Sequence, residues 1–187
     1  VWMDKILEVN RDMVVVNASE GIEILGRDPH VWLSPRNAKV MVKNIYKALA
    51  EIDPGNKEYY ARNMEEYLKD LDDLDREIRE IFSRVKGRRF IVYHPSWGYF
   101  ARDYNLTQIP IEEEGKEPTA ARIAALIEEA EKFNIKVIFV SPQFSHRNAE
   151  VIAEEIGGKV VSIDPLAKDY IRNLRSVAEE LAKAMGG

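Results

Sequence analysis

Apolar residues recur at helical spacing through a long stretch of the first half of the chain. They stand four and three residues apart in turn, and charged side chains fill most positions between them. The members of this seam are Tyr60, Met64, Tyr67, Leu71, Leu74, Ile78, Ile81 and Val85. The pattern predicts one long amphipathic helix over residues 54–85. Such a helix is either half of a coiled coil or a rigid strut between two lobes, and one seam does not distinguish them.

Shorter signals predict a strand and a second helix ahead of the long one. Residues 13–17 form a β-branched run that ends at an asparagine, which is typical of a buried strand. Ser34 followed by Pro35 matches an N-cap and a proline at the first helical position, so we expect a helix that ends near Ile52. An Asp-Pro pair at 53–54 repeats this signal and predicts the start of the long helix.

Strands and helices alternate in the second half of the chain, after Gly87. Three short, mostly apolar runs predict strands, at residues 90–93, 137–140 and 160–163, and the continuous apolar run at 137–140 is typical of a strand buried on both faces. Capping residues and helical spacing predict helices near residues 96–104, 118–130, 145–156 and 168–185. Strands that alternate with helices indicate right-handed crossovers and a parallel sheet, so the predicted fold class is α/β.

Composition and charge exclude several classes of function. The 187 residues carry a formal net charge of −5 without a basic cluster, so nucleic acid is not expected as a partner. The absence of cysteine excludes thiolate metal sites and cysteine nucleophiles. No stretch is apolar enough to span a bilayer, and no P-loop, nucleophile elbow or dinucleotide-binding motif occurs. The many Lys and Glu residues resemble the composition of proteins from hyperthermophiles.

Two candidate metal ligands follow from the predicted sheet. His94 comes directly after the strand that ends at Tyr93, and Asp164 comes directly after the strand that ends at Ile163. Ligands of open α/β sheets bind beyond the carboxyl ends of the strands, and parallel strands place both side chains at that edge. Imidazoles with a carboxylate suit zinc, and also manganese or iron. His30 lies in a loop far away in the sequence, and local patterns do not place it.

Three other groups have a more ordinary interpretation. His146 begins a predicted helix among polar neighbours and is typical of a surface histidine. The glutamates at 112–114 resemble a metal-binding acidic run, but such runs are usually solvated loops. Ser96 lies two residues after His94, so a Ser–His couple is conceivable, but no further motif supports it.

Four motifs resemble, in order, those of the zinc and manganese solute-binding proteins of ABC importers. They are D-P-H-V-W-L-S-P at 28–35, Y-H-P-S-W-G-Y-F-A at 93–101, E-G-K-E-P-T at 114–119 and S-I-D-P-L at 162–166. The resemblance covers the whole chain and implies two α/β lobes joined by one long helix, with the metal between them. It also implies metal ligands at His30, His94 and Asp164. The histidine at position 94 resembles zinc-preferring members, although their common histidine-rich loop is not visible here.

The resemblance further implies a domain organisation with an incomplete front. Residues 1–53 correspond to a remnant of the N-terminal lobe, residues 54–85 to the linking helix and residues 86–187 to the C-terminal lobe. In the family, a section that carries a fourth ligand precedes the region matching Val1. We therefore expect the N-terminal lobe to be incomplete, the chain to be metal-free or to bind zinc weakly, and its truncated form to be able to self-associate.

These observations lead to one expected function and two alternatives. We expect a non-enzymatic, extracytoplasmic subunit, anchored to the membrane through a missing N-terminus, that captures Zn²⁺ or Mn²⁺ for an ABC permease. The first alternative is a metal-dependent hydrolase or lyase that uses His30, His94 and Asp164 with an open coordination position. It lacks a convincing general base, and no residue is assigned a catalytic role. The second alternative is a surface adhesin that a metal stabilises.

Overall fold

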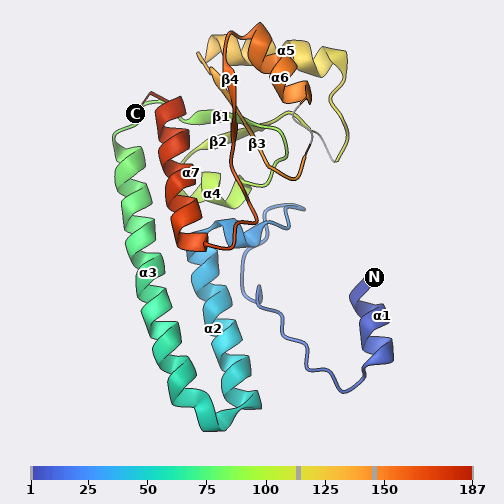
Figure 1. The fold of residues 1–187 in the computed structure, drawn as a ribbon, viewed down its shortest axis with the longest axis vertical. Coiled ribbons are helices and arrows are strands. Elements are labelled where there is room, and N and C mark those ends of the chain that lie inside the picture. The colour runs from blue at the N-terminus through green and yellow to red at the C-terminus, as the bar shows by residue number, and fades with distance from the viewer. Residues whose placement is uncertain (1, 113–114, 145–146, 187) are drawn as a thin grey trace.

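The computed structural model describes residues 2–112, 115–144 and 147–186. It has the predicted α/β class, with helices on both sides of a parallel sheet (Figure 1). The helices are α1 (Trp2–Val9), α2 (Pro35–Ile52), α3 (Lys57–Ser83), α4 (Gly98–Asp103), α5 (Ala120–Lys132), α6 (Arg147–Glu155) and α7 (Tyr170–Ala184). The strands are β1 (Arg89–Val92), β2 (Thr107–Pro110), β3 (Val137–Val140) and β4 (Lys159–Ser162). Two 3-10 turns, η1 (Val31–Leu33) and η2 (Pro54–Asn56), precede α2 and α3.

The four strands lie in the order β2-β1-β3-β4, and every neighbouring pair is parallel. From β1 the chain continues to β2 on one side, whereas from β3 it continues to β4 on the other. The direction of winding therefore reverses between β1 and β3. In open α/β sheets, ligands bind beyond the carboxyl ends of the strands at such a point.

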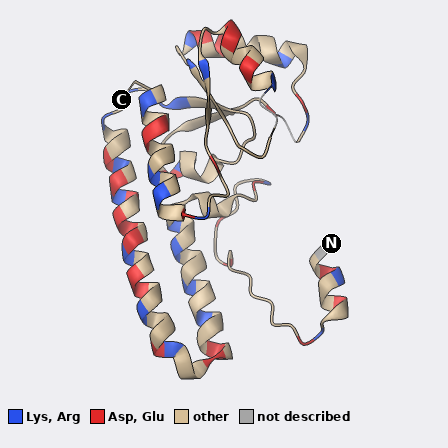
Figure 2. Cartoon of the chain, in the orientation of Figure 1, with Lys and Arg blue, Asp and Glu red and all other residues tan. Residues whose placement is uncertain are grey.

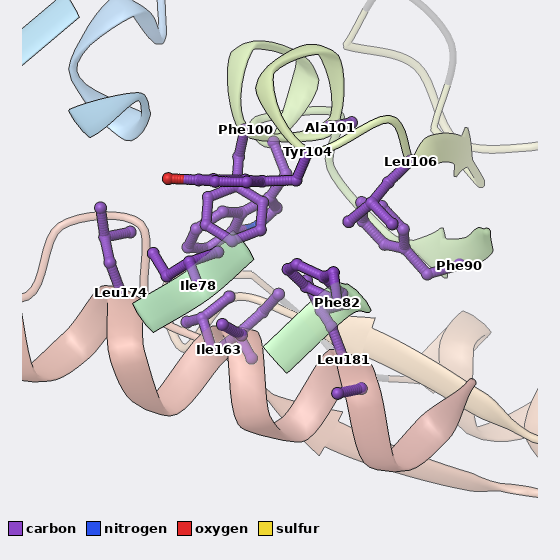
Figure 3. Packing of buried hydrophobic residues seen from close by; sticks show 14 of the residues in the cluster. Ile78, Phe82, Phe90, Phe100, Ala101, Tyr104, Leu106, Ile163, Leu174 and Leu181 are labelled. Carbon is purple, nitrogen blue, oxygen red and sulfur yellow. The ribbon is translucent and has the colours of Figure 1, made fainter. Parts of the chain in front are cut away.

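Two hydrophobic clusters cover the two faces of the sheet. Side chains alternate between the faces along a strand. Phe90 and Phe139 accordingly pack with α3, α4 and α7, whereas Ile91 and Ile138 pack with α5 and α6. Figure 3 shows the first cluster, in which Phe82 of α3 lies between the aromatic residues of α4 and the apolar side of α7. The sheet is thus held in a three-layer arrangement.

The long helix α3 is a strut within this chain. Its seam residues Leu71, Leu74 and Ile78 are completely buried, and the helix packs against α2 and α7. Of the two alternatives for the heptad seam, the structure favours the strut over the coiled coil, because the central part of the seam is buried by the same chain. Acidic and basic residues line the rest of α3 (Figure 2), and several pair one turn apart, such as Arg79 with Asp75.

One predicted strand is wrong. Residues 13–17 are extended but form no strand, and Val14, Val15 and Val16 are 66%, 50% and 42% exposed. A β-branched run becomes a strand only when another strand takes up its backbone hydrogen bonds, and none lies beside it in the part of the chain that the structure describes.

Two elements escaped the sequence analysis, α1 and β2. Strand β2 has the sequence Thr-Gln-Ile-Pro in place of an apolar run, because it is an edge strand, where proline is tolerated. Over the described residues, no helix combines the length and apolar character needed to cross a membrane.

Candidate metal site

Two loops from distant parts of the chain bring His30 and His94 together. The ring centroids are 5.2 Å apart, with one ring edge-on to the other. Their side chains are 15% and 24% exposed, so both are sheltered while remaining accessible. The strand-end rule predicted the place of His94, and the fold supplies His30 from the loop ahead of η1.

Asp28 fixes the imidazole of His30. Its Oδ1 accepts a hydrogen bond from the backbone N–H of His30 at 2.9 Å and lies 2.6 Å from Nδ1 of the same residue. A carboxylate can only accept hydrogen bonds, so Nδ1 carries the proton and Nε2 presents its lone pair. Histidines that bind metals usually donate their other ring nitrogen to a carboxylate in this way.

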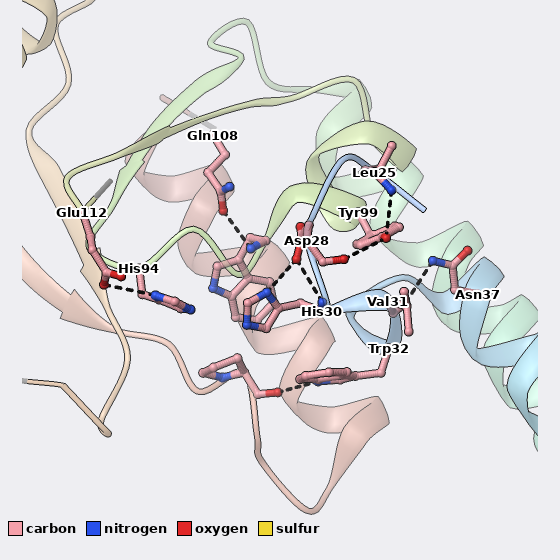
Figure 4. A network of polar contacts seen from close by, with 12 residues as sticks. Leu25, Asp28, His30, Val31, Trp32, Asn37, His94, Tyr99, Gln108 and Glu112 are labelled. Atoms are coloured by element: carbon pink, nitrogen blue, oxygen red, sulfur yellow. Dashed lines mark hydrogen bonds and ion pairs between the residues drawn. The ribbon is translucent and has the colours of Figure 1, made fainter. Parts of the chain in front are cut away.

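Glu112 fixes the imidazole of His94 in the same way (Figure 4). Its Oε2 lies 3.1 Å from Nδ1 of His94, and only 6% of the residue is exposed. The interpretation of this acidic run as a solvated loop is therefore wrong for Glu112, because its backbone continues the pairing beside β1 and turns the side chain inward. Its backbone N–H donates to the carbonyl of Tyr93 at 3.0 Å. Glu113 and Glu114 lie outside the described residues.

Asp164 lies beyond β4, at the same edge of the sheet as His94. Its Oδ1 accepts hydrogen bonds from the backbone N–H of Leu166 at 2.9 Å and from Nε2 of Gln143 at 2.8 Å. Within residues 2–112, 115–144 and 147–186, Oδ2 receives no hydrogen bond. Like the two histidines, Asp164 has one atom fixed by the protein and one available to a metal.

Trp32 connects the His30 loop to the Asp164 loop. Its indole ring lies 5.4 Å from the ring of His30, and its Nε1 donates to the carbonyl of Pro165 at 2.9 Å. The hydroxyl of Tyr170 donates to the carbonyl of Trp32 at 2.7 Å, and burial raises the pKa of Tyr170. The segment after β4 therefore holds the residue next to His30 at two points.

The helix α4 supports the same loop from the other side. The hydroxyl of Tyr99 donates to the carbonyl of Asp28 at 3.1 Å and accepts from the N–H of Leu25 at 3.0 Å. Gly98 leaves no room for a side chain beside Asp28. Ser34, whose Oγ caps α2, also donates a hydrogen bond to Asp103 at the end of α4.

Of the three predicted ligands, the structure brings two into contact, and the three do not form a compact ligand cluster. His30 and His94 are in contact, and Asp164 reaches them through the Trp32 connection. Among the described residues, no three His, Cys, Asp or Glu side chains lie close enough together to hold a metal ion. The structure thus shows a pair of histidines in contact, with Asp164 in a separate loop at the carboxyl ends of the same strands.

Ser96 and His146 are the other two residues with an ordinary interpretation. The Oγ of Ser96 is buried and has no hydrogen-bond partner in the described part of the chain, so it forms no Ser–His couple with His94. His146 lies outside the described residues.

Four contributors were not recognised from the sequence. The contact of Asp28 could have been inferred, because Asp28 stands two residues before His30 and its side chain can reach the imidazole. Glu112 had only the weak signal of an acidic run, and Gln143 and Phe144 had none, because their partners lie in loops that follow other strands. Phe144 stacks on His94 with ring centroids 4.8 Å apart and an interplanar angle of 22°.

Known proteins match this chain along nearly all of its length. The model of a protein family described as zinc-uptake complex component A, periplasmic, matches residues 1–184. The high-affinity zinc uptake system protein ZnuA of Bacillus subtilis (strain 168) is 37% identical over 174 residues. The match covers 82% of this chain and 54% of that protein, so the chain spans about half the length of this relative.

Two solved structures share the fold. A crystal structure of ZnuA superposes with a TM-score of 0.97 at 43% sequence identity, over 99% of this chain and 74% of that one. A ZnuA deletion mutant with zinc bound superposes with a TM-score of 0.93 at 44% identity, over 100% of this chain and 74% of that one.

Proposed function

Because this chain belongs to the family of periplasmic zinc-uptake components A, we propose that it forms the metal-binding part of a solute-binding subunit. In this role it captures a transition-metal ion outside the cytoplasm and delivers it to an ABC permease in the membrane. The single observation that carries the proposal is the His30–His94 pair, in which each Nδ1 faces a carboxylate. That arrangement leaves both Nε2 atoms to bind a cation.

We propose Zn²⁺ as the cargo and Mn²⁺ as the weaker competitor. Two imidazole nitrogens favour zinc, whereas manganese prefers sites dominated by oxygen ligands. Asp164, at the carboxyl ends of the same strands, is the proposed third donor through Oδ2. A fourth ligand comes from water or from a further protein segment, which completes the tetrahedral coordination that zinc prefers.

The proposed role requires no catalysis by this chain. The family is one of transport components, and the Oγ of Ser96, the nearest nucleophile to the centre by sequence, makes no hydrogen bond to His94 within the described residues. We also propose the division into a partial N-terminal lobe over 1–53, a linking helix over 54–85 and a C-terminal lobe over 86–187. The span of α3 and the confinement of the sheet to residues 89–162 support it.

Zinc titration of the 187-residue chain tests the proposal. We expect saturable binding of one Zn²⁺ by isothermal titration calorimetry, lost in His30→Ala and His94→Ala and weakened in Asp164→Ala. His146→Ala is the histidine control and should bind like the unaltered chain. Equal loss from all three histidine substitutions would show that the proposed ligands are wrong.

A further inference from the structure

The loop that follows β3 touches two of the three proposed zinc ligands. Gln143 donates from Nε2 to Oδ1 of Asp164 at 2.8 Å, and the next residue, Phe144, stacks on the ring of His94. The turn is closed by a hydrogen bond of 3.1 Å from the N–H of Phe144 to the carbonyl of Ser141. Residues 141–144 are called the β3 loop below.

The order of the strands explains why this loop has both contacts. His94 follows β1 and Asp164 follows β4, and β3 lies between those two strands. The β3 loop consequently emerges between the two ligand-bearing loops. It also stands beside the point where the winding of the sheet reverses, which is where α/β sheets bind their ligands.

The contact with Phe144 restricts the orientation of the His94 ring. The two rings are nearly parallel, at 22°, with centroids 4.8 Å apart, and the ring centroid of Tyr93 lies 6.3 Å from that of Phe144. Glu112 holds Nδ1 of His94 at the edge of the ring. With one edge and one face occupied, the imidazole cannot rotate without losing a contact, so the direction of Nε2 is set.

The contact with Gln143 selects one oxygen of Asp164. Gln143 and the N–H of Leu166 both donate to Oδ1, at 2.8 and 2.9 Å. A carboxylate held through one oxygen presents the other in a defined direction. Gln143 also supplies a neutral donor where a second carboxylate would repel Asp164.

We propose that Gln143 and Phe144 are positioning residues of the zinc site, which set the direction of the donor atoms of Asp164 and His94 from one loop. This inference rests on the proposed function and adds two residues to it. Neither side chain binds the metal. Loss of a residue that orients a metal ligand typically weakens metal binding by about 10–100-fold.

The test compares zinc affinity among variants of the full 187-residue chain, by competition with a chromophoric chelator. We expect Phe144→Leu and Gln143→Ala each to weaken zinc binding by about 10–100-fold. Phe144→Tyr keeps the stacked ring and should bind like the unaltered chain. Gln143→Glu cannot donate to Asp164 and should weaken binding more than Gln143→Ala.

A matched control separates positioning from a general effect of surface phenylalanines. Phe133 is 37% exposed and Phe144 is 38% exposed, but Phe133 lies between α5 and β3, at the opposite edge of the sheet. Phe133→Leu should leave zinc affinity unchanged. The visible absorption spectrum of bound Co²⁺ adds a readout of ligand geometry, and it should change in Phe144→Leu and Gln143→Ala but not in Phe133→Leu.

A double substitution tests whether Gln143 acts through Asp164. In an Asp164→Ala background, Gln143→Ala should weaken zinc binding no further; an additive loss would overturn this part of the inference. Thermal melting of the metal-free variants shows which of them fold. If Phe144→Leu does not fold, the Gln143 variants test the inference.

If the unaltered chain binds zinc and both Phe144→Leu and Gln143→Ala bind it equally well, the inference is overturned while the proposed function stands. Failure of the unaltered chain to bind zinc overturns the proposed function, and this inference with it.

Discussion

Gly98 packs so closely on Asp28 that a Cβ atom at position 98 would lie 2.5 Å from Oδ2 of Asp28. Real Cβ atoms essentially never approach a heavy atom so closely, so Asp28 has to move if Gly98 is replaced. Because Asp28 holds both the backbone N–H and Nδ1 of His30, the absence of a side chain at Gly98 is part of the proposed metal site.

Gly98→Ala should therefore weaken zinc binding without unfolding the chain. The displaced carboxylate releases Nδ1 of His30, and loss of such a support costs about 10–100-fold in affinity. Calorimetric zinc titration measures the effect. Gly55→Ala is the control, because the nearest atom to a Cβ there is Oδ1 of Asp53 at 3.8 Å. Equal affinities of the two variants would mean that Asp28 does not position His30.

The two carboxylates behind the histidines should contribute separately. We expect Asp28→Ala and Glu112→Ala each to lower zinc affinity by about 10–100-fold, because each leaves one imidazole without its acceptor. Asp28→Asn retains an acceptor oxygen and should lose less. Glu128→Ala, an exposed glutamate on α5, is the control for a change in net charge alone. If Glu128→Ala weakens binding as much as Glu112→Ala, the effect is general electrostatics.

The raised pKa of Tyr104 predicts how the free energy of unfolding changes above pH 10. Its hydroxyl donates to Oδ1 of Asp75 at 2.9 Å, and burial, followed by the charge of Asp75, raises the pKa of Tyr104 well above its ordinary value of 10.0. The folded chain keeps this proton at a pH where the unfolded chain loses it. The contribution of Tyr104 to the free energy of unfolding is therefore complete below pH 10. It declines by about 1.4 kcal/mol per pH unit as the pH rises beyond 10.

Tyr104→Phe separates this effect from the titration of other groups. The substitution removes a hydrogen bond to a charged group and should lower the free energy of unfolding at pH 8 by about 1.5–3 kcal/mol. Between pH 10 and 11, its stability should then fall less steeply than that of the unaltered chain. Urea unfolding at several pH values measures both quantities, with exposed Tyr59→Phe as the control. Parallel pH profiles for the unaltered chain and Tyr104→Phe would contradict the assignment.

Leu74→Ala tests the strut. Leu74 is completely buried where α3 meets the core of the sheet, and truncation of such a leucine leaves a cavity that costs about 2–5 kcal/mol. Leu49→Ala on α2, where the side chain is 39% exposed, should cost much less. Denaturant titration of both variants measures the two losses in the free energy of unfolding. A small loss for Leu74→Ala would mean that the seam is not part of the core.

The sequence predicted those parts of the fold and site that depend on local pattern. The N-cap at Ser34, the strands β1, β3 and β4, and the positions of His94 and Asp164 at strand ends all follow from residues close to one another. What it missed depends on partners elsewhere. Residues 13–17 have the composition of a strand but no neighbouring strand among the described residues, and β2 lacks that composition because it lies at the edge.

The carboxylate of Glu112 illustrates the same limit within the site. Three successive glutamates usually face solvent, and nothing in the sequence indicates that the first of them turns toward an imidazole 18 residues earlier. His30 could be linked to His94 only through the family resemblance. Contacts between loops of different strands are set by the order of the strands in the sheet, and that order is not encoded in any short segment.

The hydrogen bonds of Trp32 also determine when the site can form. Its indole reaches Pro165 and its carbonyl is held by Tyr170, across 133 and 138 positions of the chain. Contacts between such distant residues form late, because a long loop has to close before they are made. A chain still emerging from synthesis, with its last helix missing, lacks both of these contacts of Trp32, although Asp28 and Tyr99 can already hold the His30 loop. The proposed metal site is therefore complete only when the end of the chain has folded.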